Sequence, residues 1–157
     1  MNNVFDKRFW EDLTTLDFSN MDLENCLAIL PVAAIEQHGP HLPVKVDSTI
    51  INGIVEMIAK KLPRDSKAVF LPTQKIGKSN EHLAFPGTLS LSTETFFATL
   101  MDIGGCVASC GIKKLMLINS HGGNVSVLDT VTRELRVKHN MLVFNVNWFG
   151  LGMPEGV

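Results

Sequence analysis

The sequence predicts an α/β fold in which a mostly parallel sheet is covered by helices on both faces. Short, continuous apolar runs indicate strands that are buried on both sides, as in parallel sheets. Segments with apolar residues at helical spacing alternate with these runs along the chain. Because strands that alternate with helices pair in parallel through right-handed crossovers, the order of the elements favours this architecture.

The first half of the chain is predicted to contain two strands and one helix. The apolar run 27–34 is the first predicted strand, and 68–71 is the second. Between them, apolar residues recur at helical spacing up to position 62; Asp47 and Ser48 are expected to cap this helix, which should stop before Pro63. The segment from Pro72 to Ser90 is too long and too polar for an ordinary connection, so we expect a functional loop there.

The second half is predicted to continue the alternation. A helix is expected to begin at Ser92 or Thr93 and to end near Gly111. Gly104 and Gly105 inside it each cost about 1 kcal/mol relative to alanine, so we expect close helix packing there. The remaining predicted elements are a strand at 114–119, a helix after His121 and a strand at 142–146.

Length and composition indicate one globular domain over residues 1–157. A chain of this size can bury roughly 70% of its unfolded surface, and 45% of its residues are hydrophobic. The formal net charge of -2, without a concentrated basic patch, argues against a nucleic-acid partner. Three cysteines make no complete disulfide framework, and neither a signal peptide nor a membrane-spanning stretch is evident. We therefore expect a cytoplasmic protein without a membrane partner.

Residues that can bind metal follow the predicted strands at the carboxyl edge of the sheet, where ligands of such folds bind. Glu36 and His38 leave the first strand two positions apart, so their side chains can share one face. Asp47 stands at a predicted helix start, which favours an ionised carboxylate. His121 leaves the third strand before two glycines that let the backbone approach a ligand. This mixed nitrogen and oxygen set suits Zn, Mn or Fe(II).

Each of these residues also has a simpler interpretation. His38 alone is more often a hydrogen-bonded loop histidine, and Asp47 alone is more often a helix cap. Glu36 is harder to explain in this way, because an ionised carboxylate at a buried strand end is costly unless it is paired or metal-bound. The metal hypothesis therefore depends on the combination of residues.

Other candidate residues keep two interpretations. His82 lies in the long loop, where contact with substrate and simple packing are equally expected. His41, flanked by prolines, is expected to serve a rigid turn, with support of a metal ligand left open. Cys106 and Cys110 lie four apart on one helix face and could bind metal, but in this apolar company they are expected to be buried small hydrophobes. His139 is expected to face solvent.

Three ordered motifs resemble the creatininase (creatinine amidohydrolase) family. They are Glu36-Gln37-His38-Gly39-Pro40-His41-Leu42-Pro43 followed by Asp47, Gly77-Lys78-Ser79-Asn80-Glu81-His82 with Phe85-Pro86-Gly87-Thr88, and Asn119-Ser120-His121-Gly122-Gly123-Asn124. The resemblance extends from about Trp10 to about Trp148. It implies a three-layer α/β/α sandwich that commonly assembles into homo-oligomers, including hexamers.

The resemblance also implies roles for individual residues. Ser79 corresponds to a residue at the substrate, and Asp47 to a carboxylate that bridges two metals. The complete set of implied metal ligands is Glu36, His38, Asp47 and His121.

The sequence departs from the creatinine-cleaving members of the family at two points. Those members carry Tyr and Glu where this chain has Gly122 and Gly123, and that Glu completes the second metal site. Members with the His-Gly-Gly-Asn variant act on other substrates, including formamide-type compounds and a modified peptide. The family also continues past the end of this chain with a further catalytic His, so the domain is expected to be C-terminally incomplete.

These observations predict a metal-dependent amidohydrolase that cleaves a C-N bond of a small amide, cyclic amide or formamide-type substrate. Two divalent metals per chain would activate water for attack on the amide carbon. Asn119 or the backbone N-H groups around Gly122 and Gly123 are expected to stabilise the oxyanion, and His82 or His41 to protonate the leaving nitrogen. The alternative is a noncatalytic or truncated module that binds metal or oligomerises without turnover.

Overall fold

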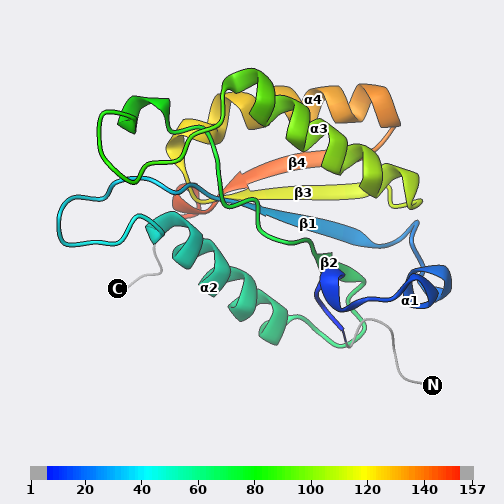
Figure 1. Ribbon diagram of the computed structural model, residues 1–157. Coiled ribbons are helices and arrows are strands. Elements are labelled where there is room, and N and C mark those ends of the chain that lie inside the picture. Colours follow the sequence, from blue (N-terminus) through cyan, green and yellow to red (C-terminus); the bar gives the residue numbers. More distant parts are fainter. Residues whose placement is uncertain (1–6, 153–157) are drawn as a thin grey trace.

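The computed structural model describes residues 7–152 and shows one sheet with helices on both of its faces (Figure 1). Residues 1–6 and 153–157, which belong to the predicted domain, lie outside the described part of the chain. In chain order, the principal elements are α1 (Thr15–Asn20), β1 (Leu27–Val32), α2 (Val46–Lys61), β2 (Ala68–Phe70), α3 (Thr93–Ser109), β3 (Lys114–Asn119), α4 (Val125–His139) and β4 (Leu142–Asn147). Short 3-10 helices include η3 (Asn80–His82) and η4 (Gly122–Asn124).

The sheet has the strand order β2-β1-β3-β4, and each neighbouring pair is parallel. The central strands β1 and β3 pair along their whole length, from Leu27 opposite Lys114 to Val32 opposite Asn119. The Ser120 N-H donates to the Val32 carbonyl at 3.0 Å, just beyond the paired strands. The segments that leave β1 and β3 therefore start side by side, although nearly ninety residues separate them in the sequence.

The two faces of the sheet are buried against different helices, as Figure 1 shows. Leu30 of β1 belongs to a core cluster with Phe96 of α3 and Leu128 of α4. Its neighbour Ile29 points to the other face, where it joins Ile51 of α2. This alternation confirms the predicted three-layer α/β/α arrangement, because successive side chains of a strand point to opposite faces.

The start of α2 differs from the prediction. The helix begins at Val46 with Lys45 as its N-cap, so Asp47 and Ser48 lie inside the first turn and the prediction that they cap it is wrong. The Ser48 hydroxyl donates to the Ala34 carbonyl at 3.2 Å, which ties α2 to the segment after β1. Asp47 is therefore held in a rigid turn with its carboxylate free to face other groups.

Helix α3 follows its prediction closely. Ser92 caps it, because its hydroxyl accepts from the Thr95 N-H at 3.1 Å. The expected close contact at Gly104 is confirmed: a Cβ there would lie 2.5 Å from Leu135 Cδ1 on α4. The expectation of buried thiols on this helix is wrong, since Cys106 and Cys110 are both exposed.

Two further observations were not predicted. His139 was expected to face solvent, but its Nε2 atom is buried without a hydrogen-bond partner. Helix α1 begins with a capping box, in which Thr14 and Asp17 each accept from the other's backbone N-H.

Within the described residues, no helix combines the length and apolar character needed to cross a lipid bilayer.

Candidate metal centre

The predicted ligand residues converge beyond the carboxyl ends of β1 and β3. One ligand atom from each of Glu36, His38 and Asp47 lies within 4.8 Å of the others. His121 Nδ1 lies 3.2 Å from Glu36 Oε1 and 3.2 Å from Asp47 Oδ2. Glu36, Asp47 and His121 are buried, and the His38 side chain is 24% exposed, so the cluster is open to solvent on the His38 side.

Asp47 lies between the two histidines. Its Oδ2 faces His121 Nδ1 at 3.2 Å, and its Oδ1 faces His38 Nε2 at 3.4 Å. Each carboxylate oxygen therefore has a different imidazole as its neighbour. The position of Asp47 in the first turn of α2 sets this placement, which would allow one carboxylate to contact two cations.

The donor atoms fit a divalent cation in spacing. Zinc bonds of about 2.0 to 2.1 Å in a tetrahedral site place neighbouring donor atoms about 3.3 Å apart. The contacts of His121 and His38 with the carboxylates, at 3.2 to 3.4 Å, match that spacing. Glu36 Oε2 and Asp47 Oδ2 are buried without a hydrogen-bond partner, which is costly for carboxylate oxygens unless a cation compensates.

Each of the His121 and His38 rings has one nitrogen that faces the carboxylates (the inner nitrogen) and one that faces away (the outer nitrogen). The contacts of the outer nitrogens determine whether the inner nitrogens carry a hydrogen. His121 Nε2 lies 3.0 Å from the Lys78 carbonyl, and His38 Nδ1 lies 3.2 Å from the Glu36 carbonyl. Because a carbonyl oxygen can only accept, these outer nitrogens carry the protons of the neutral rings. The inner nitrogens then present lone pairs, as histidine ligands of metals do.

The field at this cluster is negative. Burial of His121 acts to lower its pKa, but the carboxylates of Asp47 and Glu36, together with the Lys78 carbonyl, outweigh burial and raise the pKa above its usual value. The same carboxylates would attract a metal cation. The charge of the cluster and the chemistry of its donor atoms therefore both favour a bound cation.

Asn119 holds the loop that carries His121. Its Oδ1 accepts from the His121 N-H at 3.1 Å, and its Nδ2 donates to the His121 carbonyl at 2.7 Å and to Asn147 Oδ1 at 2.8 Å. Asn124, which the sequence reasoning did not single out, donates to Asn119 Oδ1 at 3.2 Å and accepts from the Lys78 N-H at 2.9 Å. Both amide hydrogens of Asn119 are thus engaged, and none is left for an oxyanion.

The predicted substrate-binding residues differ in exposure. Ser79 is fully buried, with its Oγ 3.2 Å from His121 Nε2, behind the ring rather than before it. Gly122 is exposed, and a Cβ there would meet no atom within 4 Å. Gly123 is packed so tightly that a Cβ would lie 2.4 Å from the Lys78 carbonyl oxygen.

The two loop histidines, His82 and His41, differ in their position relative to the cluster. His82 Nε2 lies 3.7 Å from Glu36 Oε2, and the His82 side chain is 30% exposed, so this residue borders the cluster. His41 is exposed and lies beside Gly39. Sequence reasoning also missed Gln37, whose Nε2 lies 3.1 Å from His82 Nδ1. Its place between two candidate ligands was the available signal.

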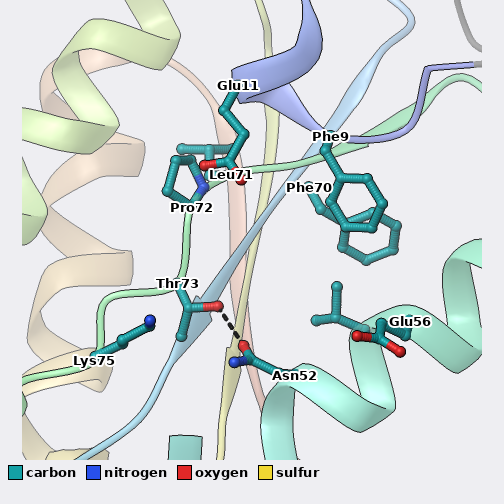
Figure 2. A pocket seen from close by; sticks show the side chains of 10 residues that line it. Phe9, Glu11, Asn52, Glu56, Phe70, Leu71, Pro72, Thr73 and Lys75 are labelled. Atoms are coloured by element: carbon teal, nitrogen blue, oxygen red, sulfur yellow. Dashed lines mark hydrogen bonds between the residues drawn. The ribbon is translucent and has the colours of Figure 1, made fainter.

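A separate hollow of about 480 Å³ lies between α2, the end of β2 and the segment around Phe9. Figure 2 shows its lining, including the hydrogen bond of 2.8 Å from Thr73 Oγ1 to Asn52 Oδ1. None of the predicted ligand or catalytic residues lines it. The candidate chemistry is therefore at the strand ends and not in this hollow.

The fold is a parallel α/β sandwich. Its glutamate, aspartate and histidine side chains cluster beyond the central strands, at the edge where such folds bind ligands. The molecule therefore belongs to the class of α/β proteins with a candidate cation site at that edge. The chain belongs to the creatininase family, because the family model described as creatinine amidohydrolase matches residues 11–156.

The relatives of this chain include several hydrolases. It is 32% identical over 131 residues to the mycofactocin precursor peptide peptidase of Mycolicibacterium smegmatis, covering 82% of this chain and 51% of that protein. It is 32% identical over 121 residues to the creatinine amidohydrolase of Pseudomonas putida, covering 71% and 45%. The chain thus spans about half the length of these relatives.

Solved creatininase structures share the fold. A mutant creatininase complexed with creatine superposes with a TM-score of 0.79 at 28% identity, over 95% of this chain and 61% of the other. A mutant creatininase described as Zn-Zn type gives 0.77 at 28% identity, over 94% and 61%. A creatininase described as an Mn form gives 0.72 at 29% identity, over 88% and 58%.

Proposed function

We propose that this chain forms the metal-binding part of a hydrolase that cleaves an amide C-N bond with metal-activated water. The observation that carries the proposal is the spacing of 3.2 to 3.4 Å between the inner histidine nitrogens and the two carboxylates. The creatinine amidohydrolase and the peptide peptidase among its relatives support hydrolysis of a C-N bond. The proposed substrate is a small amide, cyclic amide or formamide-type compound.

The ligand roles follow from the contacts. Glu36, Asp47 and His121 would hold one cation, and Asp47 would share a second with His38. The Zn-Zn and Mn creatininases favour zinc or manganese, and iron remains compatible with the same donors. When bound, such metals supply Lewis acidity that activates water and polarises a carbonyl.

The surrounding residues would orient the ligands and the substrate. The carbonyls of Glu36 and Lys78 keep the two ligand rings in the tautomers that face the cluster with a lone pair. Asn119 fixes the His121 backbone, so we assign it positioning instead of oxyanion binding. The backbone N-H groups at Gly122 and Gly123, where η4 begins, are the proposed oxyanion donors.

Ser79 and His82 complete the proposed site. Ser79 lies against the outer nitrogen of His121 and would orient this ligand rather than touch substrate. His82 would be catalytic, because its Nε2 lies 3.7 Å from Glu36 Oε2 and its side chain is partly exposed.

Metal analysis of the native protein tests the ligand set. We expect close to two metals per chain in the wild type and a sharp fall in Asp47→Asn, which keeps the shape of the bridge but removes its charge. Asp102→Asn, which changes an exposed aspartate on α3, is the matched control and should keep its metal.

The same samples test turnover. The wild type and the control should release ammonia, formate or amine from a panel of small amides, and a chelator should stop the release. Metal retained by Asp47→Asn would contradict the proposed bridge. A wild-type chain that binds metal yet turns over no amide would support the noncatalytic module instead.

A further inference from the structure

His82 differs from the two ligand histidines in what its outer nitrogen contacts. The outer nitrogens of His38 and His121 face carbonyl oxygens, which accept hydrogen bonds. The outer nitrogen of His82, Nδ1, faces the side-chain amide of Gln37 at 3.1 Å. The direction of that amide therefore determines the protonation of the ring.

The orientation of the Gln37 amide follows from a backbone contact. The Gly39 N-H donates to Gln37 Oε1 at 3.0 Å, and a backbone N-H can only donate, so this end of the amide is the oxygen. The other end is the NH2 group, which donates to His82 Nδ1. With Nδ1 as the acceptor, the neutral His82 ring carries its hydrogen on Nε2.

Local structure keeps this arrangement in place. Gly39 has a φ of +77°, a conformation that glycine adopts without steric cost, and this turn brings its N-H back onto Gln37. The Gln37 N-H donates to Thr88 Oγ1 at 3.2 Å. The Phe85 ring lies 6.4 Å from the His82 ring between centroids. Gln37 is thus held through both its side chain and its backbone.

The Nε2 atom of His82 lies near the cluster but makes no hydrogen bond with Glu36. Its distance of 3.7 Å to Glu36 Oε2 exceeds that of a hydrogen bond. A nitrogen that carries a hydrogen has no lone pair for a metal.

We infer that Gln37 is a positioning residue that keeps the hydrogen of the His82 ring on Nε2, and that this Nε2-H stabilises the developing oxyanion of the substrate instead of binding metal or passing a proton. This role rests on the proposed hydrolase function, and it replaces the proton donation expected for His82 from the sequence. An imidazole N-H can act in this way, because a preorganised hydrogen bond to a developing oxyanion is stabilising.

The tautomer is measured directly on zinc-loaded protein with 15N-labelled histidine, using long-range nitrogen to proton correlations. His82 should carry its hydrogen on Nε2, and the His82→Phe spectrum assigns its signals. In Gln37→Glu an acceptor faces Nδ1, so a hydrogen should appear on Nδ1. Gln74→Glu is the matched control, because Gln74 donates to the Ile76 carbonyl away from this site, and it should leave the His82 signals unchanged.

Kinetics separate hydrogen bonding from proton transfer. His82→Gln keeps an N-H donor that cannot act as a general acid, so it should keep kcat within about tenfold of wild type, whereas His82→Phe should lose about 100-fold to 1000-fold in kcat with little change in KM. Equal losses in both variants would overturn the donor role.

The two proposals fail in distinguishable ways. The spectra need no substrate, so a hydrogen on Nδ1 of wild-type His82, or a metal on its Nε2, overturns the inference even if amides are hydrolysed. Absence of turnover with the Nε2-H tautomer present overturns the hydrolase proposal and, with it, the oxyanion role.

Discussion

The partners of single nitrogen atoms divide the three histidines of this site into two kinds. A carbonyl behind the ring leaves the inner nitrogen of His38 and of His121 bare, and an amide NH2 behind the ring of His82 leaves its inner nitrogen protonated. The distinction decides which rings suit a metal and which suits an oxyanion.

The two glycines after His121 offer a matched pair of substitutions. In Gly123→Ala the new Cβ would lie 2.4 Å from the Lys78 carbonyl oxygen and 2.5 Å from His121 Nε2, so backbone and ligand must shift. We expect a loss of about 1 to 3 kcal/mol in the free energy of unfolding, typical of overpacking, and weaker zinc binding. Gly122→Ala, with no atom within 4 Å of its Cβ, is the control.

Urea unfolding and zinc titration of both variants check this prediction. Gly122→Ala should match the wild type in both measurements. Equal behaviour of the two variants would show that the loop yields easily at Gly123 and that the contact with Lys78 does not hold His121.

The sequence was informative about which side chains meet, and less so about what their atoms do. Glu36, Asp47 and His121 could be expected together because they follow strands or begin a helix at one edge of the sheet. The engagement of Asn119 and the contact of Gln37 with His82 depend on amide orientations set by residues elsewhere in the fold. Residue order carries no signal for those directions.

At the scale of elements, the packing of α3 on α4 gives a second matched pair. A Cβ at Gly104 would lie 2.5 Å from Leu135 Cδ1, and Leu135 is fully buried, so it has little room to move. Gly104→Ala should therefore destabilise the fold by about 1 to 3 kcal/mol despite the better helix propensity of alanine.

Gly105→Ala should have the opposite sign. Its nearest foreign atom would be His139 Nε2 at 3.6 Å, an ordinary contact, so the helix propensity of alanine should raise the free energy of unfolding by up to about 1 kcal/mol. Chemical denaturation of the two single variants measures both effects. A stabilising Gly104→Ala would mean that α4 can move away without cost.

The strands were the most predictable elements. Continuous apolar runs placed β1 and β3 within two residues of their ends, because strands buried on both faces leave little choice of residue type. The start of α2 was misplaced, because Asp47 has the composition of a cap but faces the histidines. Helix α1 has six residues and none of them buried, so no apolar periodicity could reveal it.

At the scale of the whole molecule, the candidate metal would link three elements. Glu36 follows β1, Asp47 belongs to α2 and His121 follows β3. A cation held by all three is bound by the native state alone, so it should stabilise the fold by mass action, by about 2.7 kcal/mol at free zinc 100 times its Kd.

Thermal unfolding with and without zinc measures this linkage. The midpoint should rise with zinc in the wild type and in Asp102→Asn, and a chelator should reverse the rise. Asp47→Asn should lose most of it. A rise of the same size in Asp47→Asn would place the zinc elsewhere on the chain.

The full-length parallel pairing of β1 with β3 also affects the order of events during folding. The ligands after β1 and after β3 cannot meet until a chain segment of more than eighty residues has closed, and such distant contacts form late and slowly. A refolding chain should therefore bind zinc only in the last stage of folding. The rate at which the refolding protein removes zinc from a coloured indicator would then report the rate at which the sheet is completed.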